Sequence, residues 1–145
     1  MDFLIDRKET IVVGNDSFIA SDSIKHENYH VVFEDDAETG YFYALDTNFE
    51  QPIQEALHIY NVKDVVDKEK PSEIIIVWSN DGLKSILYIN NYPHAIFDFE
   101  NKNGFCRTGF PPRDKKSQWS TNGHEWNEVF YLNIIGKNNI NHTVN

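Results

Sequence analysis

The sequence contains one cysteine and few basic residues. Cys106 is the only cysteine among 145 residues, so an internal disulfide is impossible, and a disulfide-rich secreted scaffold is excluded. Lysine and arginine number 13 against 23 aspartates and glutamates, which gives a formal net charge of -10 at pH 7. This balance argues against a protein that binds nucleic acid through a net basic surface.

Long apolar runs are also missing. The longest, Ile74 to Trp78, has the length of a strand, whereas a membrane-spanning helix needs about 20 apolar residues. Residues 1–6 carry neither the basic start nor the apolar stretch of a secretion signal. Together with the single cysteine, these features predict a cytoplasmic protein that does not bind membranes.

Three fragments resemble catalytic or metal-binding motifs but lack a required residue. Residues 124–128 begin like the helix of zinc proteases, but Glu128 stands where the second histidine is needed. The spacing from Cys106 to Arg113 is too long for the phosphate loop of cysteine phosphatases, and it includes two prolines without an N–H. In the acidic segment 34–45, Gly40 stands one position too late for the glycine of an EF-hand loop. Leu45 stands where that loop needs a glutamate as its last ligand. We therefore predict no catalytic residue, no metal site and no cofactor.

The sequence is rich in aromatic residues, which make up 14% of it. Its length predicts a single domain over residues 1–145 that buries a core without disulfides. Residues 1–9 are mixed in polarity and the segment 138–145 is rich in asparagine, so we expect both ends to fray.

Most of the chain alternates in the manner of strands. Residues 29–34 and 40–46 form a predicted hairpin around an acidic turn, with Tyr29, Val31 and Phe33 on one face. Residues 73–110 predict a meander of strands separated by turns rich in asparagine, aspartate and glycine. The run at residues 74–78 is apolar on both faces, which places that strand centrally in the sheet.

Helical spacing is strongest in residues 52–61. Pro52 suits a first helical position, and Ile53, Ala56, Leu57 and Tyr60 form one apolar stripe. A second short helix or a strand is predicted near Trp126 and the residues that follow it. The expected fold is α+β: a mainly antiparallel sheet of about five to seven strands, with one or two short helices on one face. The other face is then partly open, or the sheet curls into a half-barrel.

Four stretches resemble a family of small bacterial proteins that has no assigned function. They are Gly40 to Asp46, Ile76 to Gly82, Tyr92 to Phe99 and Cys106 to Pro111. The resemblance covers about residues 29–128. It implies a bacterial, cytosolic, single-domain protein, and it supplies no catalytic residues to carry over.

The co-occurrence of acidic and aromatic residues suggests a binding role. Tyrosine and tryptophan are common interface anchors, and an acidic surface attracts a basic partner, although the same charge also keeps a small protein soluble. We expect a non-enzymatic module, more narrowly an immunity protein or antitoxin that occludes the active site of a basic bacterial toxin. The predicted contact residues are Glu34, Asp35, Asp36, Glu38, Tyr41 and Tyr43.

Two other functions remain open at this point. The first is a small-molecule-binding protein or an unrecognised enzyme with a pocket between sheet and helix, lined by His94, Asp98, Cys106 and Arg107. An ion pair across neighbouring strands from Asp98 to Arg107 is a further expectation. The second is a structural or regulatory subunit of a partner encoded in the same operon.

Overall fold

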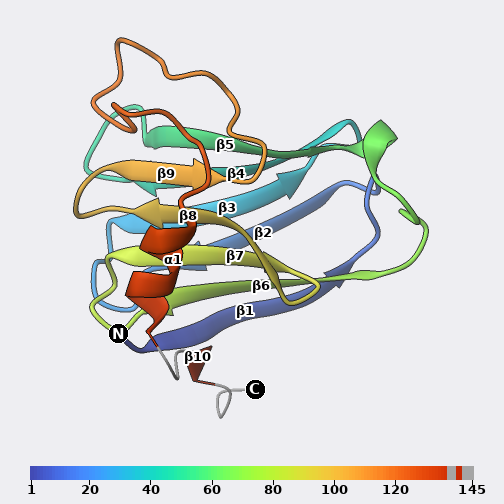
Figure 1. The fold of residues 1–145 in the computed structure, drawn as a ribbon, viewed down its shortest axis with the longest axis horizontal. Coiled ribbons are helices and arrows are strands. Elements are labelled where there is room, and N and C mark those ends of the chain that lie inside the picture. Colours follow the sequence, from blue (N-terminus) through green and yellow to red (C-terminus); the bar gives the residue numbers. More distant parts are fainter. Residues whose placement is uncertain (137–139, 142–145) are drawn as a thin grey trace.

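The computed structural model describes residues 1–136 and 140–141. Two sheets and one short helix make up its regular structure (Figure 1). Sheet A contains β1 (Phe3–Ile11), β6 (Ser72–Ser79), β7 (Lys84–Ile89), β8 (Tyr92–Asp98), β9 (Asn103–Cys106) and β10 (Ile140–Asn141). Sheet B contains β2 (Ser17–Asp22), β3 (Tyr29–Asp35), β4 (Thr39–Asp46) and β5 (Ile53–Asn61). The helices are α1 (Glu128–Ile135) and the single 3-10 turn η1 (Val62–Asp64).

The strands of each sheet follow a simple order. Sheet A runs β10-β1-β6-β7-β8-β9 and sheet B runs β2-β3-β4-β5. All these neighbours are antiparallel except β1 and β10, which are parallel. The mainly antiparallel class with a short helix is therefore confirmed, but the strands form two sheets packed face to face and not one curled half-barrel.

The main core lies between the two sheets. Alternate residues of β3, β4 and β5 point inward and meet the inner side of β6, β7 and β8. Trp78 is fully buried there, and its indole N–H donates to the Ser21 hydroxyl at 2.9 Å. Ser21 in turn donates to Asp6 at 2.6 Å. This chain of hydrogen bonds satisfies the polar atoms where β1 and β2 approach each other.

A second core lies on the other side of sheet A, under α1. Tyr131 and Ile134 of the helix pack with outward side chains such as Val77 and Ile96. Asn127 caps the helix by accepting from the Phe130 N–H at 3.0 Å. Strand β6 is thus buried on both faces and lies between β1 and β7, as its continuous apolar run predicted. No helix of the described residues is long and apolar enough to cross a membrane.

The predicted helix at residues 52–61 is wrong, because the segment forms strand β5 and pairs with β4. Leu57 and Ile59 point into the core, whereas Ile53, counted in the helical stripe, is largely exposed. Tyr60 packs over Gly40, where an added Cβ would lie 2.6 Å from the ring. The apolar residues of so short a segment fit both the helical and the strand period. Pairing with β4 makes the segment a strand.

The ends of the chain also differ from expectation. Residues 3–11 are not a frayed lead-in but strand β1, which lies between β6 and β10. Its polar middle hid the strand signal, and a register shift at residue 6 interrupts the alternation. Of the tail predicted to fray, residues 140–141 pair with β1, and 138–139 and 142–145 lie outside the described residues.

The segment 107–124 runs along the edges of both sheets. Its Phe110 carbonyl accepts from the His58 N–H of β5 at 2.9 Å, and its His124 carbonyl accepts from the Cys106 N–H of β9 at 2.9 Å. The Ser120 hydroxyl accepts from the Gly104 N–H at 2.9 Å. This segment is therefore fastened to the edge strands β5 and β9.

Candidate functional site

The outer face of sheet B is left open by α1, which packs against sheet A. Its centre is built by neighbouring β3 and β4, where Glu34 pairs with Tyr41 and Val32 pairs with Tyr43. These side chains point outward because Phe33 and Phe42, on the alternate positions, point into the core. Glu34, Tyr41 and Tyr43 are half-buried and lie together, as the sequence predicted for members of one binding surface.

The two tyrosines are stacked side by side on β4. Their ring centroids lie 5.8 Å apart at an interplanar angle of 17°. Tyr41 also contacts His58 of β5, with ring centroids 5.2 Å apart. Burial, followed by the negative charge of Glu34, raises the pKa of the Tyr43 hydroxyl. The Tyr43 phenol therefore stays neutral at ordinary pH and offers a hydrogen bond beside a carboxylate.

Phe18 extends the aromatic surface onto β2. It pairs with Glu34 across β2 and β3, and 67% of its surface is exposed. An exposed phenylalanine beside a half-buried carboxylate has little to contact within its own chain. Phe18 was not among the residues that the sequence predicted to contact a partner.

Asp35 was predicted to contact a partner, and the structure contradicts this. Only 1% of its surface is exposed, because it points into the core side of β3. Its carboxylate accepts from the Tyr60 hydroxyl at 2.6 Å and from the N–H groups of Gly14 and Ala37, both at 2.8 Å. Asp35 therefore holds two turns and β5 together and cannot reach a partner on the folded surface.

The other two acids of the predicted site lie on the turn between β3 and β4. Asp36 accepts from the N–H groups of Glu38 and Thr39 at 2.9 and 2.8 Å. The Thr39 N–H, followed by that of Glu38, lowers the pKa of the Asp36 carboxyl. Asp36 and Glu38 are both exposed and present negative charge at the end of the open face.

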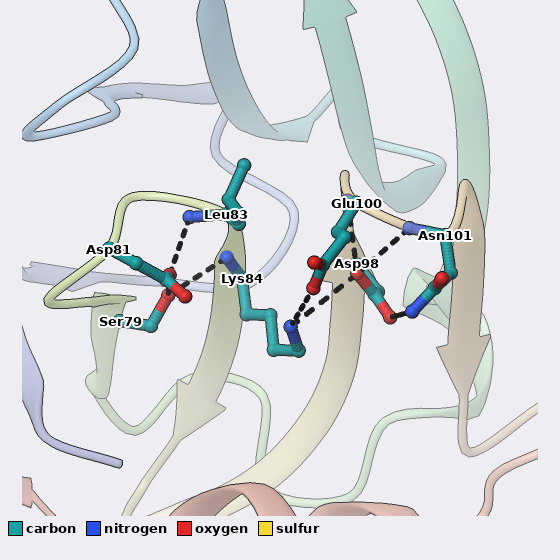
Figure 2. A network of polar contacts seen from close by, with 7 residues as sticks. All are labelled: Ser79, Asp81, Leu83, Lys84, Asp98, Glu100 and Asn101. Carbon is teal, nitrogen blue, oxygen red and sulfur yellow. Dashed lines mark hydrogen bonds and ion pairs between the residues drawn. The ribbon is translucent and has the colours of Figure 1, made fainter.

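The alternative pocket does not assemble, because Asp98 lies far along β8 from the other three residues. Asp98 is fully buried and forms an ion pair with Lys84 of β7, at 3.7 Å between Nζ and a carboxylate oxygen (Figure 2). It also accepts from the N–H groups of Glu100 and Asn101 at 3.1 and 3.2 Å. The predicted pair with Arg107 is therefore wrong, and Asp98 has a structural role at the β8–β9 turn.

Arg107 lies between two aromatic rings on the helix side of sheet A. Its guanidinium carbon is 4.4 Å from the centroid of Tyr92 and 3.9 Å from that of Trp126. Its Nε donates to the Pro93 carbonyl at 2.9 Å, and Glu128 lies 3.8 Å away. These contacts fasten the start of α1 to β8 and leave the guanidinium little freedom to bind a ligand.

Cys106 and His94 lie on neighbouring strands, beside the cross-strand pair Ala95–Cys106, but they have different surroundings. Cys106 is buried in the core between the sheets, and this burial raises the pKa of its thiol. A thiol of this kind is a poor nucleophile. His94 lines a cleft at one end of the sheets, which is described below.

His124 is a buried polar residue that the sequence did not mark as structural. Only 3% of its surface is exposed. Its Nε2 lies 2.8 Å from a Glu55 carboxylate oxygen, and its Nδ1 lies 2.5 Å from the Pro111 carbonyl. Both partners are acceptors, so both ring nitrogens must carry a proton. Burial opposes this charge, but the bonds to Glu55 and Pro111 outweigh it and raise the pKa of His124.

Within residues 1–136, the buried polar side chains form hydrogen bonds inside the protein. No cluster of three or more His, Cys, Asp or Glu side chains in the described residues is arranged to hold a metal. Every buried side-chain nitrogen or oxygen described has a hydrogen-bond partner. The open face of sheet B is thus the part of the described chain where aromatic and charged groups remain available together.

Comparison with known proteins identifies relatives but no assigned activity. Residues 11–135 match the model of a family described as "Uncharacterized protein conserved in bacteria (DUF2251)". A Haemophilus influenzae protein, named only as an uncharacterized protein, is 38% identical over 114 residues, which cover 78% of this chain and 71% of that protein. No solved structure matches the chain. The resemblance to a bacterial family without an assigned function is confirmed.

Proposed function

We propose that this chain, which belongs to the DUF2251 family of bacterial proteins, is a non-enzymatic module that binds a basic protein. The carrying observation is the open face of sheet B, where stacked Tyr41 and Tyr43 lie beside Glu34. Tyrosine supplies a large, rigid contact area that keeps a polar end, which is why it recurs at the centres of interfaces.

The charge of sheet B favours a basic partner. Its four strands contain no lysine and no arginine, and Asp22, Glu34 and Asp46 are acidic residues on them that are not buried. The other two acids, Asp35 and Glu55, are bonded within the fold. Asp36 and Glu38 add exposed negative charge at the end of the same face. A positively charged surface meets no like charge from these strands, so electrostatic steering increases its rate of association.

A toxin-neutralising role is the narrower form of this proposal. Toxins that cleave nucleic acids have basic clefts, and a face with carboxylates and phenols imitates the charge and stacking of their substrate. The proposal places the protein in the cytoplasm, where such a toxin acts. A regulatory subunit that binds a basic partner without inhibiting it is the alternative that the same surface supports.

The test is retention of a purified basic partner by the full chain at low and high salt. The partner is first captured from native cell lysate and identified, then produced separately. We expect Glu34→Lys to weaken binding by about tenfold or more, because it places a positive charge at the centre of the face. Glu69→Lys, which makes the same charge change on the exposed linker, is the matched control and leaves binding unchanged.

Each outcome has a defined meaning. Equal binding by the Glu34→Lys and Glu69→Lys variants contradicts the proposed face, and so does a captured partner that is acidic. A basic partner that kills cells when expressed alone, and is tolerated when this chain is co-expressed, supports the toxin-neutralising role. A basic partner without toxicity supports the regulatory alternative.

A further inference from the structure

A cleft of about 530 Å³ lies between the ends of the two sheets, beside the linker 62–71. Small-molecule pockets generally measure about 300–1,000 Å³, so the cleft has room for a compact ligand. Its apolar lining comes from Val13 after β1, Ile59 of β5, Val65 of the linker and Ile89 of β7. Four separate segments of the chain therefore converge on it.

His94 is an imidazole in the lining of this cleft. The β7–β8 register passes from the pair Leu87–Ala95 to the pair Tyr88–Pro93, so His94 is the extra residue of a β-bulge. A bulge of this kind redirects a side chain and is common beside binding sites. The ring meets the edge of Tyr92, with centroids 5.5 Å apart.

The ring nitrogens of His94 have no hydrogen-bond partner in the described part of the chain, and neither of them is sealed off from solvent. Burial, followed by the positive charge of Arg107, lowers the pKa of His94 to about 4. The neutral ring has one N–H donor and one bare nitrogen acceptor. Asp67 and Lys70 at the rim lie 3.9 Å apart and offset each other's charge.

We propose that this cleft binds a small, neutral, largely apolar molecule that carries a hydroxyl group, of the phenol class, with the hydroxyl hydrogen-bonded to His94. The apolar walls favour a compact hydrocarbon body, since burying it removes apolar surface from water. A charged group is disfavoured there, because no unpaired opposite charge compensates its loss of hydration. The cleft shares strand β5 with sheet B, but none of Glu34, Tyr41 and Tyr43 lines it, so its occupancy is tested separately from the proposed protein-binding function.

The test is a titration of the full chain with para-cresol, followed through the imidazole nitrogen chemical shifts of His94. Toluene has nearly the same shape without the hydroxyl and serves as the matched probe. We expect a saturable shift with para-cresol and about fivefold weaker binding of toluene, which corresponds to the loss of one hydrogen bond. Equal affinity for the two probes, or no saturation up to the solubility limit of para-cresol, overturns the proposal.

Two variants locate the binding. Val65→Trp fills the cleft from the linker and is expected to abolish binding of both probes. His94→Leu removes the hydrogen-bonding ring and is expected to bind para-cresol no better than toluene. His26→Leu, on the loop before β3, is the control and keeps the preference for para-cresol. If His94→Leu does not fold, the probe comparison in the unaltered chain still decides.

Discussion

The outer faces of the two sheets differ although both belong to antiparallel sheets of one chain. On sheet A, α1 covers a continuous apolar surface that includes Val77, Ile86 and Ile96. On sheet B, the corresponding surface carries Glu34, Tyr41 and other half-exposed side chains. The covered face contributes to folding, and the open face is available for a partner. The comparison separates residues needed for stability from residues that we propose to bind a partner.

The same difference is visible in the strand sequences. Strand β6 is apolar at every position from Ile74 to Trp78, because both its faces are buried. Strand β3 alternates, with Phe33 inward and Glu34 outward. A run without alternation thus indicates a covered sheet, and alternation indicates a face that water or a partner contacts.

The largest expected effect is a difference in stability between substitutions of two aspartates, Asp98 and Asp36, that both accept hydrogen bonds in turns. Asp98→Ala leaves the buried Lys84 ammonium with only the exposed Glu100 as a partner, so we expect a loss of about 3–5 kcal/mol in the free energy of unfolding. Asp36→Ala removes similar turn hydrogen bonds at an exposed site and should cost much less. Urea unfolding of both variants measures the difference. Equal losses would show that burial of the ion pair is unimportant.

Truncating a side chain should cost more stability on the covered outer face of sheet A than on the open outer face of sheet B. Ile96→Ala leaves a cavity under α1 and is expected to lower the free energy of unfolding by about 2–5 kcal/mol. Tyr43→Ala on the open face removes one cross-strand contact and should cost about 1 kcal/mol or less. Calorimetry on the two variants checks this. A larger loss for Tyr43→Ala than for Ile96→Ala would contradict the open character of the outer face of sheet B.

The free energy of unfolding is expected to depend on pH through the buried pair His124–Glu55. Because the folded-state pKa of His124 is raised, its contribution is full below the unfolded pKa of about 6.5 and is lost as pH rises through the folded pKa. Glu55→Gln should remove about 1.5–3 kcal/mol at mildly acidic pH and less at alkaline pH. Urea unfolding across that pH range measures the slope. Glu34→Gln on the open face is the control and should keep the slope of the unaltered chain.

The smallest effect on stability is expected at Phe18. Phe18→Ser changes an exposed side chain and should alter the free energy of unfolding by no more than about 0.5 kcal/mol. Binding of the basic partner should nevertheless weaken, because Phe18 flanks Glu34 on the proposed face. Thermal unfolding and a binding titration on the same sample check both statements. Unchanged binding would restrict the interface to β3 and β4.

Local patterns predicted the hairpin at residues 29–46 and most of the meander, because alternation and turn residues are properties of neighbouring positions. They did not predict β5, since Ile53, Ala56 and Leu57 satisfy a helical stripe and only pairing with β4 rejects it. They also missed β1, whose polar centre is explained by its contacts with other strands. Both strands are fixed by pairing between residues far apart in the chain. The local spacing of apolar residues carries no information on such pairing.

The candidate site was predictable in part for the same reason. Glu34, Tyr41 and Tyr43, which the sequence predicts as contact residues, lie together because a hairpin brings them together. Asp35 alternates inward, and its partners Gly14 and Tyr60 come from distant segments. The separation of Asp98 from Arg107 follows from the register of β8 and β9, which pairs Asp98 with Asn103 and Ala95 with Cys106.

The edge-covering segment 107–124 has a consequence for the behaviour of the protein at high concentration. The exposed edge of a sheet is a template on which a second chain adds a strand, and such additions lead to fibrils. Here the chain itself occupies backbone groups of β5 and β9 through Phe110, Ser120 and His124. Loss of these backbone contacts should therefore promote self-association, so this irregular segment protects the edge strands from aggregation.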